Sequence, residues 1–291
     1  MKTFRTSGGD VAYREEREGP PVVLLHGFPT SSVLWRAIVP ALSARMRVIT
    51  VDLLGFGRSE KPAEAPLHIR AQAGYVRELL QGNGIEEFAV AGHDIGGGVA
   101  QLLALEGGVR ALVLVDSVAF DTWPIEGVRL IQDASPDQET PEFVRDVLGV
   151  ALDLGLARPD ALPGDVREAY VAPFDGVEGA RAFFRAARAI DGQGLAGREA
   201  ELARLDVPAL LVWGEDDPYI PVEMADRLAD TLAHATEVLL PGCSHFLPED
   251  APETLADLMS EFLRARYLGL SHGHEHAAGP VPLELHRRGP A

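Results

Sequence analysis

The sequence predicts an α/β fold: a mostly parallel eight-stranded sheet with helices on both faces and an inserted helical cap. The first observation is that short apolar segments of strand length alternate with helix-length segments in both halves of the chain. The second is that residues 118–205 break this alternation and carry helical patterns only. The third is the length of 291 residues, with 46% hydrophobic and 24% charged residues, which suits one large globular domain with an insertion.

Eight segments are predicted as strands, and their character changes along the chain. The first two are expected to form an antiparallel hairpin that turns at Gly8 and Gly9. The later segments are continuously apolar, which is typical of parallel strands covered on both faces. The predicted strands are 2–6, 10–16, 21–26, 46–52, 87–92, 109–116, 208–213 and 235–240, and the predicted core helices are 32–44, 67–82, 95–106, 222–233 and 251–266.

The chain is therefore divided into four parts. Residues 1–117 form the first part of the core, 118–205 the helical cap, and 206–268 the second part of the core. Residues 269–291 contain many Pro and Gly and few apolar residues, so a flexible C-terminal tail is expected. Its three histidines, His272, His274 and His276, are predicted to be unstructured rather than a metal site.

One pentapeptide, Gly-His-Asp-Ile-Gly at 92–96, has the pattern G-x-nucleophile-x-G with Asp94 at the nucleophile position. An apolar strand precedes it and a helix follows it, so the side chain is expected to project from a sharp strand-to-helix turn. A carboxylate held there can attack an electrophilic carbon and leave an ester on the enzyme. That chemistry opens epoxides or displaces halides.

Three further loops follow predicted strands. They are His-Gly-Phe-Pro at 26–29, the acidic loop at 214–217, and the loop that contains His245. The carboxyl ends of parallel strands meet at one edge of a sheet, where ligands bind, so these loops are expected to converge with Asp94. The chain order of nucleophile, acid and histidine is the order in which one type of catalytic triad is built.

These four motifs in this order resemble the α/β-hydrolase family, and the resemblance extends from about residue 20 to about residue 266. Asp94 places the chain beside the Asp-nucleophile members, the epoxide hydrolases and haloalkane dehalogenases. The resemblance implies that His245 activates water and that Asp217, three residues after Gly214, orients His245. Asp116, at the end of the sixth predicted strand, is a rival for that orienting role.

The backbone N–H groups of Phe28 and Ile95 are expected to form the oxyanion hole. His26 and His93 are also candidates for catalysis, but both belong to framework motifs of the family, so a structural role is expected for them. The turn at 52–59 is interpreted as framework as well.

The substrate class depends on the group that assists the leaving atom. Epoxide opening needs an O–H donor, which epoxide hydrolases supply from two cap tyrosines. The cap here has one, Tyr170, so a second donor is unidentified; Tyr219 is a candidate for substrate contact, as is Trp123 at the cap entrance. An epoxide hydrolase acting on a small apolar epoxide is therefore the favoured function.

Two alternatives stay open. A haloalkane dehalogenase would need N–H donors where Phe28 and Ile95 stand, and their side chains cannot donate. However, Trp123 could donate, and residues 29–36 look like the dehalogenase sequence after the same loop. A ligand-binding protein without turnover is the other alternative. A serine-type esterase is disfavoured because position 94 carries no hydroxyl.

The charge and composition limit the partners. A net charge of −18 argues against nucleic acids and anionic membranes. The longest apolar runs have strand length, the N-terminus lacks a signal-peptide pattern, and the single cysteine, Cys243, allows no internal disulfide. We therefore expect a cytoplasmic monomer or homodimer that uses a small apolar electrophilic substrate and water, without metal or cofactor.

Overall fold

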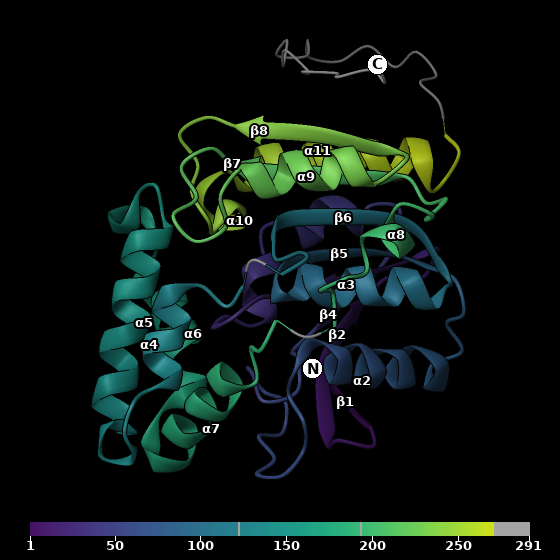
Figure 1. Cartoon of the computed structure of the whole chain (residues 1–291). Helices are drawn as coiled ribbons and strands as arrows, with labels where there is room; N and C mark the ends of the chain where they lie inside the picture. Colours follow the sequence, from purple (N-terminus) through teal and green to yellow (C-terminus); the bar gives the residue numbers. More distant parts are fainter. Residues whose placement is uncertain (122, 193, 271–291) are drawn as a thin grey trace.

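The computed structural model describes residues 1–121, 123–192 and 194–270. Its centre is one eight-stranded sheet with the strand order β1-β2-β4-β3-β5-β6-β7-β8 (Figure 1). β2 pairs antiparallel with β1 and β4, and all other pairs are parallel. The strands are β1 (Lys2–Arg5), β2 (Asp10–Glu16), β3 (Pro21–Leu25), β4 (Arg47–Val51), β5 (Phe88–Asp94), β6 (Val109–Ser117), β7 (Ala209–Gly214) and β8 (Ala235–Leu240).

Each central strand is buried on both faces, which explains its continuous apolar sequence. In β3, Val23 and Leu25 pack into one hydrophobic cluster, while Val22 and Leu24 pack into the cluster on the opposite face. Successive side chains of a strand point to opposite faces, so both sets must be apolar when helices cover both.

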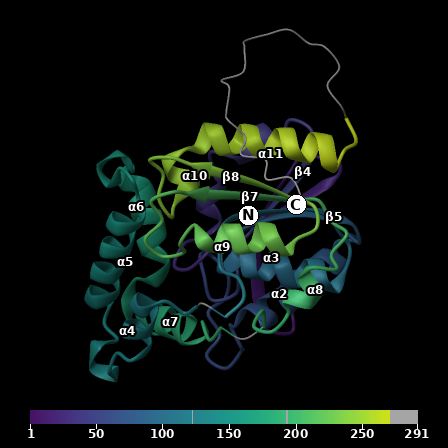
Figure 2. The ribbon, with the colours of Figure 1, turned by 45° about the horizontal axis from the view of Figure 1, so that its top comes forward.

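The two faces are covered by different helices, as Figure 2 shows from a second direction. One layer holds α2 (Ile69–Gly82), α3 (Ile95–Glu106) and α9 (Glu223–Thr231). The other holds α1 (Val39–Leu42), α10 (Leu247–Asp250) and α11 (Pro252–Arg266). The predicted helix 32–44 is divided into a 3-10 turn, η1 (Ser32–Trp35), and α1, because Pro40 supplies no backbone N–H to continue a single helix.

Between β6 and β7 the chain forms a separate group of helices. Figure 1 shows most of them beside one end of the sheet, whereas the last one, α8, lies apart from the others and contacts α3. Thr140 begins α5 as a capping residue, because its side-chain oxygen accepts a hydrogen bond from the Phe143 N–H at 3.1 Å. The helices are α4 (Glu126–Gln132), α5 (Pro141–Gly155), α6 (Gly164–Val171), α7 (Gly176–Arg188) and α8 (Glu199–Leu202), with 3-10 turns η2 (Pro136–Gln138), η3 (Pro159–Ala161) and η4 (Ala172–Phe174).

The fold class predicted from the sequence is confirmed, including the hairpin at the start and the mostly parallel sheet. No helix among the described residues has both the length and the apolar character needed to cross a membrane. Most of the predicted tail, residues 271–291 with its three histidines, lies outside the described residues.

Candidate active site

Asp94 occupies a strained corner between a strand and a helix. It is the last residue of β5, α3 begins at Ile95, and its backbone has φ +52° and ψ −123°. A non-glycine residue with such angles persists only where its surroundings fix it. Two glycines allow the close packing: a Cβ on Gly27 would lie 2.4 Å from the Asp94 Cβ, and one on Gly96 would lie 2.4 Å from the carbonyl oxygens of β3 and its following loop.

The Asp94 carboxylate is held by two backbone donors. Its Oδ1 accepts a hydrogen bond from the Phe28 N–H at 2.7 Å, and the backbone of Ile95 also hydrogen-bonds to the carboxylate. Burial raises the pKa of Asp94 to about 6, against the opposing effects of His245 and of the two backbone donors. The carboxylate is thus mainly ionised at neutral pH, and the two expected oxyanion-hole residues lie against it.

His245 lies next to Asp94 and is oriented by an acid. Its Nδ1 donates a hydrogen bond to Asp217 Oδ2 at 2.9 Å, which leaves Nε2 free to face the cavity. Burial lowers the pKa of His245. The charges of Asp217 and Asp94 and the hydrogen bond that His245 donates to Asp217 raise it, and together they outweigh burial, so the pKa lies above 6.5. The structure therefore brings the predicted nucleophile, base and acid together.

The loop that carries Asp217 is braced from several directions. Asp217 Oδ1 accepts the backbone N–H groups of Tyr219 at 2.7 Å and Ile220 at 3.0 Å. The indole of Trp213 donates to the Ile220 carbonyl at 2.9 Å. Asp216 is exposed and takes no part in this arrangement. Both oxygens of Asp217 are therefore used, and its carboxylate has a fixed orientation toward His245.

The rival acid Asp116 has a different set of contacts. It is fully buried, and its Oδ1 accepts the Gly214 N–H at 2.8 Å, while the backbone of Leu247 is a second donor. Burial and the nearby charge of Asp217 raise the pKa of Asp116 well above its ordinary value. Asp116 therefore links the acid loop to the histidine loop, whereas the hydrogen bond that His245 donates is accepted by Asp217.

Two other histidines near the site belong to the framework. His26 accepts the Leu53 N–H at Nε2, at 3.0 Å, and its Nδ1 lies 2.9 Å from the Gly27 carbonyl oxygen. His93 Nε2 lies 2.8 Å from the His245 carbonyl oxygen. Burial lowers the pKa of His93 well below 6.5, so the ring is neutral and donates to that carbonyl. Both rings hold loops of the site in place.

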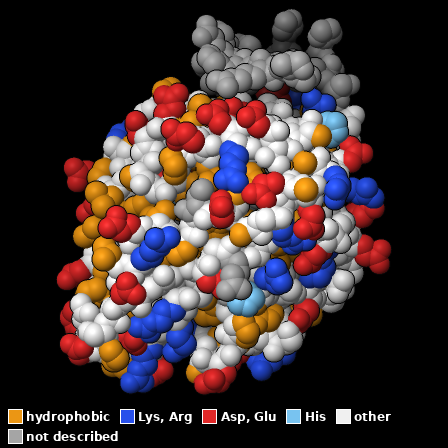
Figure 3. All heavy atoms as spheres, viewed as in Figure 1, with side chains coloured by type: hydrophobic (Ala, Val, Ile, Leu, Met, Phe, Trp, Pro, Cys, Tyr) orange, Lys and Arg blue, Asp and Glu red, His pale blue; other side chains and the backbone are white. Residues whose placement is uncertain are grey.

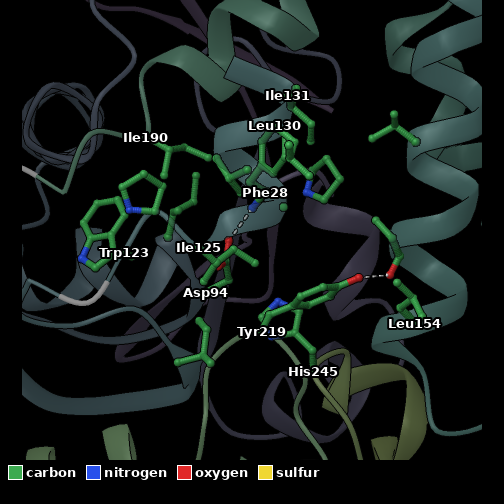
Figure 4. A pocket seen from close by; sticks show the side chains of 18 of the residues that line it. Phe28, Asp94, Trp123, Ile125, Leu130, Ile131, Leu154, Ile190, Tyr219 and His245 are labelled. Atoms are coloured by element: carbon green, nitrogen blue, oxygen red, sulfur yellow. Dashed lines mark hydrogen bonds between the residues drawn. The ribbon is translucent and has the colours of Figure 1, made fainter. Parts of the chain in front are cut away.

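Above Asp94 lies a cavity of about 510 Å³ between the sheet and the inserted helices (Figure 4). Its walls are almost entirely apolar. Trp123 and Tyr219, both expected to contact substrate, line it. The described residues around it are Phe28, Pro29, Asp94, Ile95, Val118, Trp123, Pro124, Ile125, Gly127, Val128, Leu130, Ile131, Phe143, Asp146, Val147, Val150, Ala151, Leu154, Ile190, Tyr219, Ile220, Pro221, His245 and Phe246.

Tyr170 is not among these lining residues, so its expected position above Asp94 is wrong. Its side chain is buried in the cluster on the α11 face of the sheet, together with Trp35. Its hydroxyl donates to Glu249, which also binds Arg36. The physical reason is that α6 packs against η1 and directs Tyr170 to a buried carboxylate instead of the cavity.

Sequence reasoning missed the residues that α4 and α5 contribute to the cavity. On α5, a buried stripe of Val144, Leu148 and Leu152 lies beside a second apolar stripe that faces the cavity. The second stripe consists of Phe143, Val147, Val150, Ala151 and Leu154. A surface helix usually needs one apolar stripe, so the second stripe was a signal in the sequence that this helix lines a cavity.

The chain resembles hydrolases of several specificities. It is 32% identical over 270 residues to haloalkane dehalogenase 2 of Mycobacterium tuberculosis, covering 89% of this chain and 93% of that protein. It is 31% identical to 2-hydroxymuconate semialdehyde hydrolase of a Pseudomonas strain, covering 84% and 87%. It is 28% identical to a soluble epoxide hydrolase of a Corynebacterium strain, covering 88% and 94%.

A crystal structure of an alpha/beta hydrolase fold protein from Burkholderia ambifaria superposes with a TM-score of 0.83 at 32% identity. It covers 89% of this chain and 96% of that one. The family described as the alpha/beta hydrolase family matches residues 22–258, which include the elbow, the acid and the histidine. The chain therefore belongs to the alpha/beta hydrolase family.

Proposed function

We propose that the protein is an epoxide hydrolase whose Asp94 forms a covalent ester with an apolar epoxide. The observation that carries the ester mechanism is the position of the Asp94 carboxylate. Oδ1 accepts the Phe28 N–H at 2.7 Å and the Ile95 backbone also hydrogen-bonds to the carboxylate, so the second oxygen is the one proposed to attack a saturated carbon. A serine at this corner would need a base to remove its proton, whereas an ionised carboxylate does not.

In the first step, the free oxygen of Asp94 attacks a ring carbon of the epoxide, and the carbon–oxygen bond of the ring breaks. The ester that forms keeps Oδ1 as its carbonyl oxygen, held by the Phe28 N–H. In the second step, His245 takes a proton from water, and the resulting hydroxide attacks the ester carbonyl carbon. The negative charge of the tetrahedral intermediate develops on the oxygen beside the backbone donors. When the intermediate collapses, the bond between the ester carbonyl carbon and the product oxygen breaks, this oxygen takes the proton from His245 and leaves as the diol, and the Asp94 carboxylate is restored.

The two steps are coupled through the charge of Asp94. In the free enzyme this charge is one cause of the raised pKa of His245. Formation of the ester removes this charge and so lowers the pKa of His245. The imidazole is then more often unprotonated at the step in which it must accept a proton from water. Asp217 keeps Nδ1 protonated and leaves Nε2 as the acceptor.

Tyr219 is the proposed donor to the epoxide oxygen. Among the described residues that line the cavity, it carries the one hydroxyl group. Its ring stands edge-on to His245 with the ring centres 5.0 Å apart, and its O–H donates to the Ala151 carbonyl at 2.8 Å on the cavity wall. Burial and the charge of Asp217 raise the pKa of Tyr219 to about 12, so the phenol keeps its proton and can turn it toward an alkoxide.

Haloalkane dehalogenation is the second candidate, because a relative of that name shares 32% identity over 89% of the chain. A halide needs an N–H donor, and the indole nitrogen of Trp123 is buried with no hydrogen-bond partner among the described residues. In Figure 4 this nitrogen lies on the side of the ring turned away from Asp94, and the Tyr219 hydroxyl, which donates to the Ala151 carbonyl, also points away from Asp94. The epoxide is favoured because Tyr219 lies beside His245 and carries the one hydroxyl among the described residues that line the cavity.

A single turnover in oxygen-18 water tests the ester mechanism. Water attacks the carbonyl carbon of the ester, so we expect the label in the Asp94 carboxylate after one turnover with styrene oxide. Label found only in the diol would mean direct attack of water on the epoxide and would overturn the proposal. Bromide release from bromohexane without diol formation from styrene oxide would favour the dehalogenase.

The variant His245→Gln separates the two steps. Alkylation needs only Asp94, so intact-mass spectrometry is expected to show the enzyme carrying one substrate mass. The control Asp94→Ala lacks the nucleophile and is expected to show no adduct under the same conditions.

A further inference from the structure

Three large apolar side chains at the mouth of the cavity are left in contact with solvent. Leu130 on α4 is 68% exposed, and Val150 and Leu154 on α5 are 58% and 61% exposed. All three also line the cavity that reaches Asp94. Figure 3 shows hydrophobic side chains gathered over α4 and α5. A single exposed leucine is ordinary, but three around the opening of one cavity indicate a surface that binds something apolar.

The helix that carries Leu130 is fixed on its other side. The Gln132 side chain donates to the carbonyl oxygens of Ala187 and Ile190, at 2.9 Å and 2.7 Å, and so ties α4 to the end of α7. No residue of α4 is fully buried. Val128 and Ile131 of α4 are half-buried against the core cluster, whereas Leu130 is left exposed at the opening of the cavity.

The cavity is larger than a short epoxide requires. Its volume of about 510 Å³ lies within the range of roughly 300–1,000 Å³ that is usual for drug-sized ligands. A short terminal epoxide such as epoxybutane fills only a small part of it. The reactive end is fixed at Asp94, so the rest of the space extends outward between α4 and α5 to the three exposed side chains.

The charges at the mouth exclude an anionic tail. Apart from His245, no cationic side chain occurs among the described residues that line the cavity. The basic residue of α4, Arg129, is not one of them. The exposed carboxylate of Asp146 lines the same opening. A fatty acid would bring its own carboxylate toward Asp146 without finding a partner, so the tail that fits is uncharged.

We propose that the substrate is a terminal epoxide with a long, uncharged alkyl chain. This inference rests on the proposed function: the ring lies at Asp94, and the chain runs between α4 and α5 and covers Leu130, Val150 and Leu154. When the alkyl chain binds, the exposed apolar surface of the three mouth residues and the surface of the chain are both removed from water, and this burial favours binding.

A chain-length series tests the proposal. Terminal epoxides from epoxybutane through epoxyoctane to epoxydodecane are compared below their solubility limits. Each methylene that enters the cavity is expected to raise kcat/KM about fourfold until the chain passes the mouth. A kcat/KM that is flat from epoxybutane to epoxydodecane would overturn the proposal.

The variant Leu130→Ser/Leu154→Ser removes two of the three mouth residues. Both side chains are exposed, so the fold should not depend on them. We expect KM for epoxydodecane to rise about tenfold or more, and KM for epoxybutane to change much less, because the short chain does not reach the mouth. The matched control is Val177→Ser, because Val177 is a similarly exposed apolar residue of α7, at 55%, that does not line the cavity. An equal effect of the control would count against a specific site.

The preference for an uncharged tail is tested with charged and uncharged substrates of one length. An epoxy acid of the same length as epoxydodecane is expected to react more slowly than its methyl ester, and Asp146→Asn should narrow that difference. Equal rates for acid and ester in the wild-type enzyme would contradict the expected preference for an uncharged tail.

A binding measurement keeps this inference apart from the proposed function. Dodecanol has no reactive group, and its affinity compared with that of butanol can be measured calorimetrically. Tight dodecanol binding that Leu130→Ser/Leu154→Ser weakens supports the tail site even if no epoxide is hydrolysed. Equal, weak binding of both alcohols would overturn the tail site. The tail site would also be overturned if the wild-type protein were a dimer, the double variant a monomer, and the chain-length dependence of kcat/KM the same in both, because the three exposed side chains would then form a dimer interface.

Discussion

The floor and the roof of the cavity differ in how completely their polar groups are paired. On the floor, formed by the carboxyl ends of the sheet strands, Asp94, Asp217 and His245 each have fixed hydrogen-bond partners. On the roof, formed by α4, α5 and the segment around Trp123, the walls are apolar. Under the proposed function, the core would fix the nucleophile and the water step, whereas the roof would select the substrate mainly by shape and apolar contact.

The largest effect is expected from a floor residue that never touches the substrate. Asp217→Asn keeps the shape of the side chain but offers an amide in place of one carboxylate oxygen. His245 can then adopt the wrong tautomer, and kcat should fall by up to about 10⁴-fold. Rapid-quench analysis should show an ester that forms and then persists, because the water step is the one that needs His245.

Asp116→Asn is the matched control for that experiment. Asp116 is also buried, burial raises the pKa of its carboxyl, and its Oδ1 accepts the Gly214 N–H at 2.8 Å. An Asn oxygen can accept the same hydrogen bond, so the change in kcat should stay within about tenfold. A loss as large as that of Asp217→Asn would mean that Asp116 shares the orienting role.

A smaller effect is expected where the acid loop meets the roof. Tyr219→Phe removes the proposed donor to the alkoxide, and the loss of one such donor typically costs about 10²–10³ in rate. Epoxide opening is measured as the burst of ester formation, and bromide release from a bromoalkane serves as the comparison, because halide departure needs no proton. An unchanged burst would remove Tyr219 from the mechanism.

Tyr170→Phe tests whether Tyr170, unlike Tyr219, has no part in ester formation. The Tyr170 hydroxyl donates to Glu249 in a buried cluster, so its removal should leave the burst unchanged. A hydrogen bond to a charged group contributes about 1.5–3 kcal/mol, so the free energy of unfolding should fall by that amount in denaturant titration.

The same contrast explains how much of the site could be predicted from the sequence. Asp94, Phe28 and Ile95 act through the local geometry of a strand, a turn and a helix, and the sequence motif contains that geometry. Asp217 and His245 lie in loops after β7 and β8, and the parallel sheet brings such loops together. The prediction of these five residues needed the local motifs, the order of the strands and, for Asp217, the spacing from Gly214 that the family resemblance implies.

The roof residues depend on how the inserted helices are rotated, which no local motif encodes. The sequence places Tyr170 on a helix, but the contact of α6 with η1 and the buried Glu249 decide which way the side chain points. The second apolar stripe of α5 is visible in the sequence, yet only the packing of α5 against α7 distinguishes the cavity stripe from the core stripe.

A further predicted effect is a pH dependence of ester formation that the apolar roof causes by burying Asp94. Burial raises the pKa of Asp94 from 3.8 to about 6, and a protonated carboxyl is a poor nucleophile. The rate of ester formation should therefore be constant above that pKa and fall about tenfold per pH unit below it. The second step should also slow at low pH, because a protonated imidazole cannot accept a proton from water; in the ester, the charge of Asp94 no longer contributes to raising the pKa of His245.

A roof variant can change this profile without touching the triad. Ile125 lines the cavity beside Asp94 (Figure 4), so Ile125→Ser should admit water and reduce the desolvation that raises the pKa of Asp94. We expect the midpoint of the burst-rate profile to move from about pH 6 toward the ordinary value of Asp. Asp94 would then attack at lower pH, although the looser roof would hold the substrate less tightly and raise KM. A midpoint that stays in place would mean that the groups of the floor, rather than the apolar roof, determine the pKa of the nucleophile.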